Sequence, residues 1–211
     1  MHIQRFTFNP FQENSYLLHA HGEGMLIDPG CCDESEQREL QDWLEDHAVR
    51  PVRLLLTHAH VDHVMGCAWA ERRFGLRPEV HRKDLPLLEN TAIAAALFGV
   101  DCEPPPAPVA FLEEGQVIRL GNEALNVLFV PGHAPGHVAF YNPKQGFVIG
   151  GDVLFQHSIG RTDLPGGDQE LLFESIRTKF YPLGDEVVVH PGHGPETSIG
   201  MERRENPFVR G

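Results

Sequence analysis

Three histidines and an aspartate lie within residues 57–63, which read THAHVDH and follow the apolar run VRLLL. Imidazole nitrogens and carboxylate oxygens are suitable ligands for zinc, iron and manganese. His58 and His60 are two residues apart, so both can point the same way from an extended loop. Asp62 and His63 come after the turn and can serve a second ion. The chemistry that this stretch could carry is therefore metal binding.

Other polar clusters follow apolar runs in the same way. PGHAPGH follows NVLFV, GD follows FVIG, and HPGHG follows EVVV. The ends of strands are places where rigid backbone holds side chains on loops. If these ends meet at one edge, they bring together seven candidate ligands: His58, His60, Asp62, His63, His133, Asp152 and His193. His137 and His190 are additional candidates that lie nearby in the sequence.

The number of candidate ligands favours two ions over one. A single catalytic metal uses three or four protein groups and keeps one position open. A carboxylate can bridge a pair of ions, and such a pair can hold a bridging hydroxide at neutral pH. A lone histidine is usually a surface residue or a hydrogen-bonded core residue. We assign that ordinary role to the histidines outside the pattern: His2, His19, His21, His47, His81 and His157.

The elements expected around these loops form two clusters of strands with helices between them. Strands are predicted at residues 3–9, 14–20, 24–28, 52–57 and 79–82, and then at 109–113, 116–121, 124–132, 137–142, 147–152 and 186–192. Helices are predicted at 34–47, 64–75, 84–99 (one or two), 169–181 and 198–207, with an irregular, proline-rich loop at 101–108. The apolar side of the helix at 34–47 carries Leu40, Trp43, Leu44 and Ala48. The helix at 169–181 is expected to be capped by Asp168 and to carry Leu171, Leu172, Ser175, Ile176 and Phe180 on one side. This order predicts two packed sheets with helices outside them.

Composition narrows the class of protein. A chain of 211 residues fits one large domain. The formal net charge of -13 disfavours nucleic-acid binding, because phosphate backbones would be repelled. We see no apolar signal peptide or membrane-spanning run, and the four cysteines form no CxxC pair. We therefore expect reduced thiols and a cytoplasmic location.

The motifs in their order resemble those of the metallo-β-lactamase fold superfamily. THAHVDH stands where that family has HxHxDH, and GHAPGH, GD and PGHGP follow as in the family. Within the superfamily, the chain looks like the glyoxalase II-like group and is closest to the short bacterial YcbL type. The resembling stretches are FTFNPFQENSYLL, GRTDLPGGD and GHGPETSIGMERRENPF. Ala134 stands where the family often has threonine, at a position that is not a ligand.

The resemblance implies an α/β fold, a four-layer αββα sandwich of two mixed β-sheets with helices on the outer faces. It implies a single domain over residues 1–211, without the C-terminal helical domain of standard glyoxalase II. It also implies two divalent metal ions, with zinc expected and iron or manganese as alternatives. Carried over by position, the first ion would take His58, His60 and His133, the second Asp62, His63 and His193, and Asp152 would bridge them.

The expected activity is hydrolysis of a thioester, S-D-lactoylglutathione or a related acyl-thiol, by attack of a metal-bridging hydroxide. Asp62 and Asp152 would act in catalysis, and Arg161 would meet a substrate carboxylate or else pair with Asp163. The expected partner is a small-molecule thioester, with no nucleic acid and no membrane, and the sequence leaves the oligomeric state open.

Two alternatives accompany this prediction. Persulfide dioxygenases share the fold but use a single iron ion and O₂, with two histidines and one aspartate as ligands. His193 in PGHGP favours hydrolysis over that activity, because a second metal would use it. A non-catalytic metal-binding module is the other alternative, although structural zinc sites are usually closed and rich in cysteine. A β-lactam hydrolase is less favoured, because it would normally carry a signal peptide.

Overall fold

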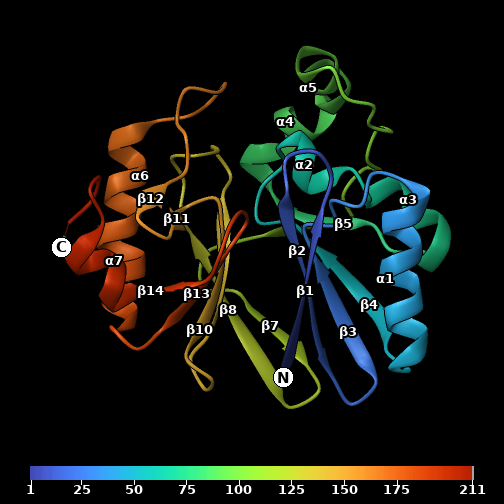
Figure 1. Cartoon of the computed structure of the whole chain (residues 1–211), viewed down its shortest axis with the longest axis horizontal. Coiled ribbons are helices and arrows are strands. Elements are labelled where there is room, and N and C mark those ends of the chain that lie inside the picture. The colour runs from blue at the N-terminus through green and yellow to red at the C-terminus, as the bar shows by residue number, and fades with distance from the viewer. Residues whose placement is uncertain (211) are drawn as a thin grey trace. The chain divides into compact units, whose positions relative to one another are not determined.

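The computed structural model describes residues 1–210 and divides the chain into two compact units (Figure 1). Unit 1 comprises residues 1–111 and 119–123, and unit 2 comprises residues 112–118 and 124–210. One six-stranded sheet lies almost entirely within each unit. The two strand clusters predicted from the sequence therefore correspond to two separate sheets.

The sheet of unit 1 has the strand order β1-β2-β3-β4-β5-β6. It is mixed, because β1, β2 and β3 pair antiparallel whereas β3–β4 and β4–β5 pair parallel. The strands are β1 (His2–Phe8), β2 (Glu13–Ala20), β3 (Glu23–Ile27), β4 (Arg50–Leu55), β5 (Pro78–His81) and β6 (Ala110–Leu112). Leu54 and Leu55 at the end of β4 are fully buried, as expected of an apolar run in a parallel strand.

The helices of unit 1 are α1 (Glu34–Asp46), α2 (Val61–Val64), α3 (Cys67–Phe74), α4 (Leu85–Glu89) and α5 (Thr91–Phe98), with a 3₁₀ turn at Arg82–Asp84. Asp33 caps α1 by accepting hydrogen bonds from the backbone N–H groups of Ser35 and Glu36. The apolar side of α1 buries Leu40 and Leu44 in a cluster with strand residues such as Phe6 and Leu17. The helix predicted at 34–47 and the burial of Leu40 and Leu44 are thus confirmed, whereas Ala48 lies beyond α1 and is exposed.

The sheet of unit 2 has the order β14-β13-β10-β9-β8-β7 and is also mixed. β10 and β13 pair parallel, whereas β8–β9, β9–β10 and β13–β14 pair antiparallel. The strands are β7 (Val117–Leu120), β8 (Glu123–Phe129), β9 (Val138–Asn142), β10 (Phe147–Gly151), β13 (Val188–Pro191) and β14 (Thr197–Ser198), and a separate hairpin joins β11 (Leu154–Phe155) to β12 (Ser158–Ile159).

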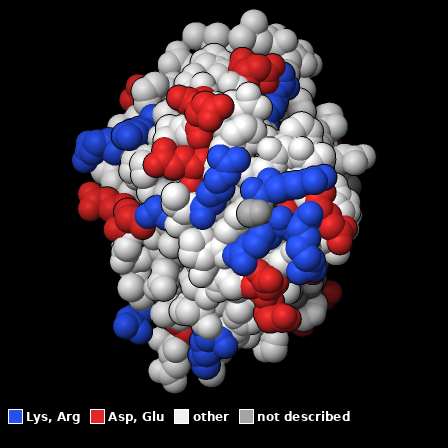
Figure 2. Space-filling model, turned by 90° about the vertical axis from the view of Figure 1, so that its left-hand side faces the viewer, with Lys and Arg blue, Asp and Glu red and all other residues white. Residues whose placement is uncertain are grey.

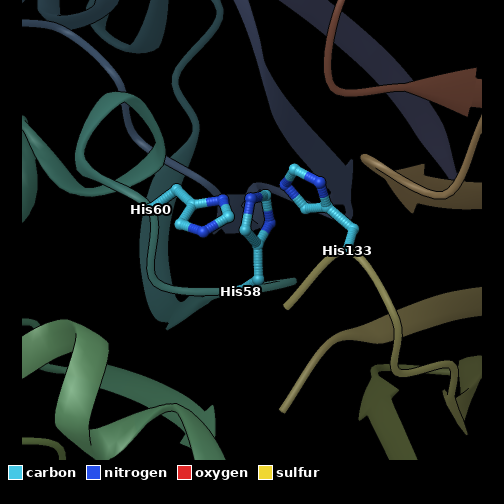
Figure 3. A group of neighbouring side chains, drawn as sticks. All are labelled: His58, His60 and His133. Carbon is cyan, nitrogen blue, oxygen red and sulfur yellow. The ribbon is translucent and has the colours of Figure 1, made fainter. Parts of the chain in front are cut away.

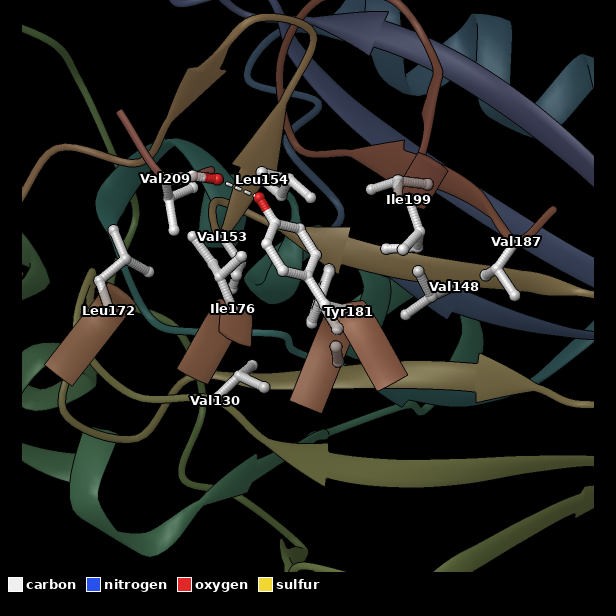
Figure 4. Close-up of a cluster of buried hydrophobic side chains, with 13 residues drawn as sticks. Val130, Val148, Val153, Leu154, Leu172, Ile176, Tyr181, Val187, Ile199 and Val209 are labelled. Atoms are coloured by element: carbon white, nitrogen blue, oxygen red, sulfur yellow. Dashed lines mark hydrogen bonds between the residues drawn. The ribbon is translucent and has the colours of Figure 1, made fainter. Parts of the chain in front are cut away.

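The helices of unit 2 are α6 (Gln169–Ser175) and α7 (Ile199–Glu205). Asp168 caps α6 as predicted, because its carboxylate accepts from the N–H of Leu171. After α6 the chain continues as a π-helical turn (Ile176–Phe180) and a 3₁₀ turn (Tyr181–Leu183). The core packs Leu172, Ile176 and Tyr181 against strand residues, and the Tyr181 hydroxyl donates to the carbonyl of Val209 (Figure 4).

Three details differ from the sequence expectations. The helix predicted at 64–75 begins earlier, as α2, and is interrupted at Gly66 before α3. A Cβ at Gly66 would lie 2.5 Å from Cys31 Sγ, so this close approach requires glycine. Leu171 was predicted on the buried side of its helix, but it is 37% exposed. The helix predicted at 169–181 widens into the π-helical turn, which changes the register of its faces.

Charges of both signs are interspersed on the face of the molecule that bears α6 and α7 (Figure 2). Arg203 Nη1 lies 2.8 Å from the Asp185 carboxylate, and Lys179 Nζ lies 2.7 Å from that of Glu114. Within residues 1–210, no helix is both long and apolar enough to cross a membrane.

Candidate metal centre

Unit 1 gathers four of the predicted ligands, which we call the unit 1 group: His58, His60, Asp62 and His63. His58 and His60 come from the loop after β4 (Figure 3), and Asp62 and His63 lie on α2. The ring centroid of His58 lies 4.8 Å from that of His60 and 4.1 Å from that of His63. Asp62 Oδ2 lies 3.6 Å from His63 Nε2. Imidazoles packed this closely, with His58 and His63 buried and His60 half-buried, are suited to share a cation.

Asp28, directly after β3, holds the unit 1 group in place. Its Oδ1 accepts from the N–H of Thr57 at 2.7 Å, and its Oδ2 accepts from the Thr57 hydroxyl at 2.6 Å. The same Oδ2 lies 3.1 Å from His63 Nδ1. These three contacts occupy the carboxylate, although Asp28, His58 and His63 are close enough to share an ion. We therefore assign Asp28 to support rather than to ligation.

Two further side chains, those of Asp84 and Asn9, fix the backbone of the unit 1 group. Asp84, fully buried, accepts from the N–H of Ala59 at 3.0 Å. The side-chain amide of Asn9 donates to the Asp62 carbonyl at 2.9 Å and to the Gly30 carbonyl at 3.1 Å. These bonds tie the ligand loop and α2 to elements far away in the sequence.

A second buried carboxylate, Glu13, lies behind His63. Its Oε1 is 3.8 Å from His63 Nδ1, and its Oε2 accepts from the Ser15 hydroxyl at 2.7 Å. Burial raises the pKa of Glu13 well above its usual range, and the neighbouring His63 opposes that rise. A Cβ at Gly30 would lie 2.1 Å from Glu13 Oε2, so glycine at position 30 makes room for this carboxylate.

Unit 2 gathers the other three predicted ligands, which we call the unit 2 group: His133, Asp152 and His193. Asp152 follows β10, His133 follows β8 (Figure 3), and His193 follows β13. The Nε2 atoms of His133 and His193 each lie 3.5 Å from Asp152 Oδ2. One carboxylate between two imidazoles is the arrangement expected of a shared ligand.

Backbone groups hold the unit 2 group. His133 Nδ1 donates to the carbonyl of Arg161 at 2.7 Å, which directs Nε2 towards Asp152. The N–H of Asp152 donates to Nε2 of the buried His137 at 3.0 Å. A Cβ at Gly160 would lie 1.9 Å from the Asp152 carbonyl oxygen, so only glycine fits there.

The remaining sequence candidates have other partners. His137 supports the Asp152 backbone, and His190 Nδ1 lies 3.2 Å from the exposed Glu196 carboxylate. The Arg161 guanidinium makes two 2.7 Å hydrogen bonds to Asp163 and lowers the pKa of that carboxyl to about 2. This ion pair is the alternative that the sequence left open for Arg161, and its substrate role stays a prediction.

The cysteines do not join either group. All four are free thiols. Burial raises the pKa values of Cys31 and Cys67, and burial together with Glu36 raises that of Cys32 to about 11. Metals bind the thiolate, which these environments disfavour at neutral pH. Cys32, Asp33 and Glu36 lie close together, but Asp33 caps α1 and Glu36 accepts from the N–H of Cys32.

The donor chemistry of both groups fits divalent metals. In His63 and His133 the Nδ1 atom faces an oxygen acceptor, while Nε2 faces a carboxylate of the same group. This arrangement selects the tautomer whose Nε2 can bind a metal, and it is typical of metal-ligating histidines. The sequence missed Asp28, Glu13 and Asn9. Asp28 could have been found, because it follows the apolar strand GMLI as the other site residues follow theirs.

Comparisons with known proteins agree with this interpretation. Residues 8–193 match the family model described as the metallo-beta-lactamase superfamily. Hydroxyacylglutathione hydrolase GloC of Haemophilus influenzae is 37% identical, with 99% of this chain and 98% of that protein covered.

Two solved structures are similar over almost their whole length. The BLEG-1 B3 metallo-beta-lactamase has a TM-score of 0.91 at 36% identity and full coverage of both chains. TTHA1623 in a di-iron-bound form has a TM-score of 0.88 at 45% identity, covering 98% of this chain and all of that one. The predicted α/β class with two mixed sheets and helices is confirmed. The chain belongs to the metallo-beta-lactamase superfamily.

Proposed function

We propose that this protein is a metal-dependent hydrolase that cleaves a thioester, S-D-lactoylglutathione or a related acyl-thiol. The observation that carries the proposal is the placement of Asp152 between two imidazoles, His133 and His193, at 3.5 Å from each. Similarity to the hydrolase GloC over nearly the whole chain supports the thioester as substrate.

The proposed ligand set joins the two groups. One ion would be held by His58, His60 and His133, the other by Asp62, His63 and His193, with Asp152 shared. Zinc is the metal that we propose first, with manganese as an alternative. The di-iron form of TTHA1623 makes iron the other alternative. When bound, two such cations acidify a water molecule to near-neutral pKa and polarise a carbonyl oxygen.

The residues of the chain supply orientation and charge for this reaction. Asp62, partly exposed at the start of α2, would accept a hydrogen bond from the attacking water and set its direction. Arg161 would exchange its exposed partner Asp163 for a substrate carboxylate. The leaving thiol has a pKa near about 8.5, so it departs as a thiolate with little need of a general acid.

The test is hydrolysis of S-D-lactoylglutathione and of simpler thioesters by the metal-loaded protein, with metal content measured in the same samples. We expect two ions per chain, and we expect Asp152→Ala to lose activity by orders of magnitude together with bound metal. Asp46→Ala removes an exposed carboxylate at the end of α1 and should change neither quantity. If Asp152→Ala kept its full rate and metal content, the shared-ligand role would be wrong.

The same metal-loaded protein can be used to distinguish the hydrolase from the alternative, a persulfide dioxygenase. A single-iron enzyme would consume O₂ and would not need His193, whereas the hydrolase needs no O₂. We expect His193→Ala to lower thioester hydrolysis strongly, because this side chain contacts Asp152. Oxygen uptake with a persulfide substrate, unaffected by His193→Ala, would favour the dioxygenase instead.

A further inference from the structure

Two phenylalanines of unit 1 form an aromatic pair that the proposed chemistry does not use. Phe11 lies in the turn between β1 and β2, and Phe98 is the last residue of α5. Their ring centroids are 5.6 Å apart and their planes are nearly perpendicular, at 87°. Phe98 is 43% exposed and Phe11 is partly buried. The pair therefore presents apolar surface to solvent while its underside is packed.

The pair is attached to the element that carries Asp62. The N–H of Phe11 donates to the side-chain carbonyl of Asn9 at 3.0 Å. The amide nitrogen of the same side chain donates to the Asp62 carbonyl at 2.9 Å. Two hydrogen bonds thus connect the aromatic turn to the backbone of a proposed metal ligand.

Packing makes a second connection between Phe11 and α2. Val61 and Met65 at the two ends of α2 form a buried cluster with Ala95 of α5. Phe11 packs against this cluster from the side. The aromatic pair is therefore held by the same helices that position Asp62, and it is a fixed surface rather than a loose loop.

Charge indicates what this surface can bind. The three chain segments that supply the pair, Asn9 and α2 are residues 6–37, 54–71 and 84–118, and they contain no lysine or arginine. Arg72, directly after the second segment, is paired with Glu103 of the third. An anionic group placed on this surface would find no lysine or arginine in these segments to pair with, whereas an uncharged apolar group would bury area on both rings.

We propose that the Phe11–Phe98 pair binds an uncharged, apolar portion of the thioester, so that the protein favours substrates with an aliphatic or aromatic arm. This inference rests on the proposed thioesterase function, since the pair is defined by its attachment to Asp62. It adds a substrate class to that function: thioesters whose acyl or thiol side is larger and less polar than a lactoyl group.

The experiment compares thioesters of increasing chain length on the metal-loaded full chain. One series varies the acyl group from two to about eight carbons on an uncharged N-acetylcysteamine thiol, and a second varies the thiol on a fixed acetyl group. In one of the series we expect KM to fall roughly two- to fourfold per added methylene, as partial burial of each methylene implies. In Phe98→Ala this dependence should largely disappear.

Two other variants separate apolar contact from general damage. Phe98→Leu keeps an apolar side chain and should retain most of the chain-length dependence. Phe208→Ala removes a phenylalanine of unit 2 that is 53% exposed and lies outside the site, so its KM values should match the parent protein. KM values that do not depend on chain length in either series would overturn the inference while leaving thioester hydrolysis intact.

If the protein does not hydrolyse these thioesters, binding affinity and oligomeric state still test the inference. Calorimetry with uncleavable thioethers of increasing length should show tighter binding to the parent protein than to Phe98→Ala. Equal affinity for the two proteins would overturn the inference independently of any activity. Sedimentation tests whether a second copy of the protein covers the pair instead. If the parent protein were a dimer and Phe98→Ala a monomer, the pair would be a contact between copies and the inference would be wrong.

Discussion

In unit 1 the imidazole of His63 faces a buried carboxylate, whereas in unit 2 the imidazole of His133 donates to a main-chain carbonyl. The unit 1 group thus depends on side chains such as Asp28 and Asp84 for its support. The unit 2 group depends on the main-chain carbonyl of Arg161 and, at the N–H of Asp152, on the His137 side chain. A substitution at Asp28 removes support from His63 directly, whereas the carbonyl that supports His133 is lost only if the backbone moves.

The electrostatic consequences differ as well. A carboxylate behind a metal-bound imidazole raises the basicity of the ligand more than a neutral carbonyl does. The Asp28 carboxylate lies 3.1 Å from His63 Nδ1, whereas His133 Nδ1 donates to a neutral carbonyl, so an ion held by His63 would have more negative charge behind its ligand than one held by His133. The two ions of the proposed centre should consequently differ in affinity, with the tighter site on the His63 side.

The largest effect that we expect comes from moving the backbone in unit 2. In Gly160→Ala the new Cβ would overlap the Asp152 carbonyl oxygen, at 1.9 Å, and would lie 3.1 Å from His133 Nδ1. Overpacking of this kind costs about 1–3 kcal/mol or more, and here it displaces two proposed ligands together. We expect hydrolysis to be abolished and metal content to fall, as measured by thioester assay and metal analysis.

Gly115→Ala is the matched control for Gly160→Ala. Gly115 has a φ of +76° and open space around its Cβ direction, so alanine there is strained without a clash. It should lower the free energy of unfolding by about 1 kcal/mol and leave metal content unchanged. Full metal content in Gly160→Ala would show that the backbone does not fix the unit 2 group.

The second effect comes from removing a side chain in unit 1. Asp28→Ala deprives Thr57 of its acceptor and His63 of its carboxylate. Loss of such a support typically lowers metal affinity about 10–100-fold. We expect a drop of this size for one of the two ions, measured by competition with a chelator, and a smaller change for the other.

Asp33→Ala provides the control for Asp28→Ala. It removes a carboxylate of the same unit that only caps α1, so it should cost about 1 kcal/mol of stability without changing metal affinity. If both ions lost affinity equally in Asp28→Ala, the difference that we infer between the two groups would be wrong.

A smaller effect is expected at Arg161, whose carbonyl and side chain have separate roles. Arg161→Ala keeps the carbonyl that accepts from His133, so the metal content should not change. If the side chain meets a substrate carboxylate, KM for S-D-lactoylglutathione should rise roughly tenfold with kcat unchanged, because a charge-assisted hydrogen bond is lost. Asp163→Asn breaks the ion pair but keeps the arginine, and it should not raise KM. Identical KM values for Arg161→Ala and the parent protein would show that the Arg161 side chain does not bind the substrate and only pairs with Asp163.

The same contrast explains what the sequence could predict. Strand ends and residue types located the residues of both groups, and the sequence also predicted the N-cap of α6 at Asp168. The sequence could have predicted the supporting side chain Asp28, because this residue follows a strand as Asp152 does. The sequence could not have predicted support by the carbonyl of Arg161, because every residue has a carbonyl and the folded chain decides which one lies next to His133.

The smallest effect that we expect concerns histidines of unit 1 outside the site. It changes the pH dependence of the free energy of unfolding but not metal binding. The ring of His19 stacks on that of His2 and meets the ring of Trp43 edge-on, with ring centroids 5.2 Å apart in both pairs. The ring of His47 stacks on that of Trp43, with centroids 3.9 Å apart. Burial, and then the like charges of His2 and His47, lower the pKa of His19 below its usual value near 6.5. The unfolded chain therefore binds more protons than the folded chain just below that pH.

Stability should accordingly rise with pH through this window and be lost as pH falls below about 6.5 towards the lower pKa of folded His19. His19→Gln removes this contribution, so its free energy of unfolding in urea should depend less on pH between about 5 and 6.5 than that of the parent protein. Above about pH 7.5 the slopes should coincide, because His19 is then neutral in both states. A steeper dependence in His19→Gln would contradict the sign argued here, and metal content should be the same in both proteins, since the His2–His19–Trp43 stack lies outside the two groups.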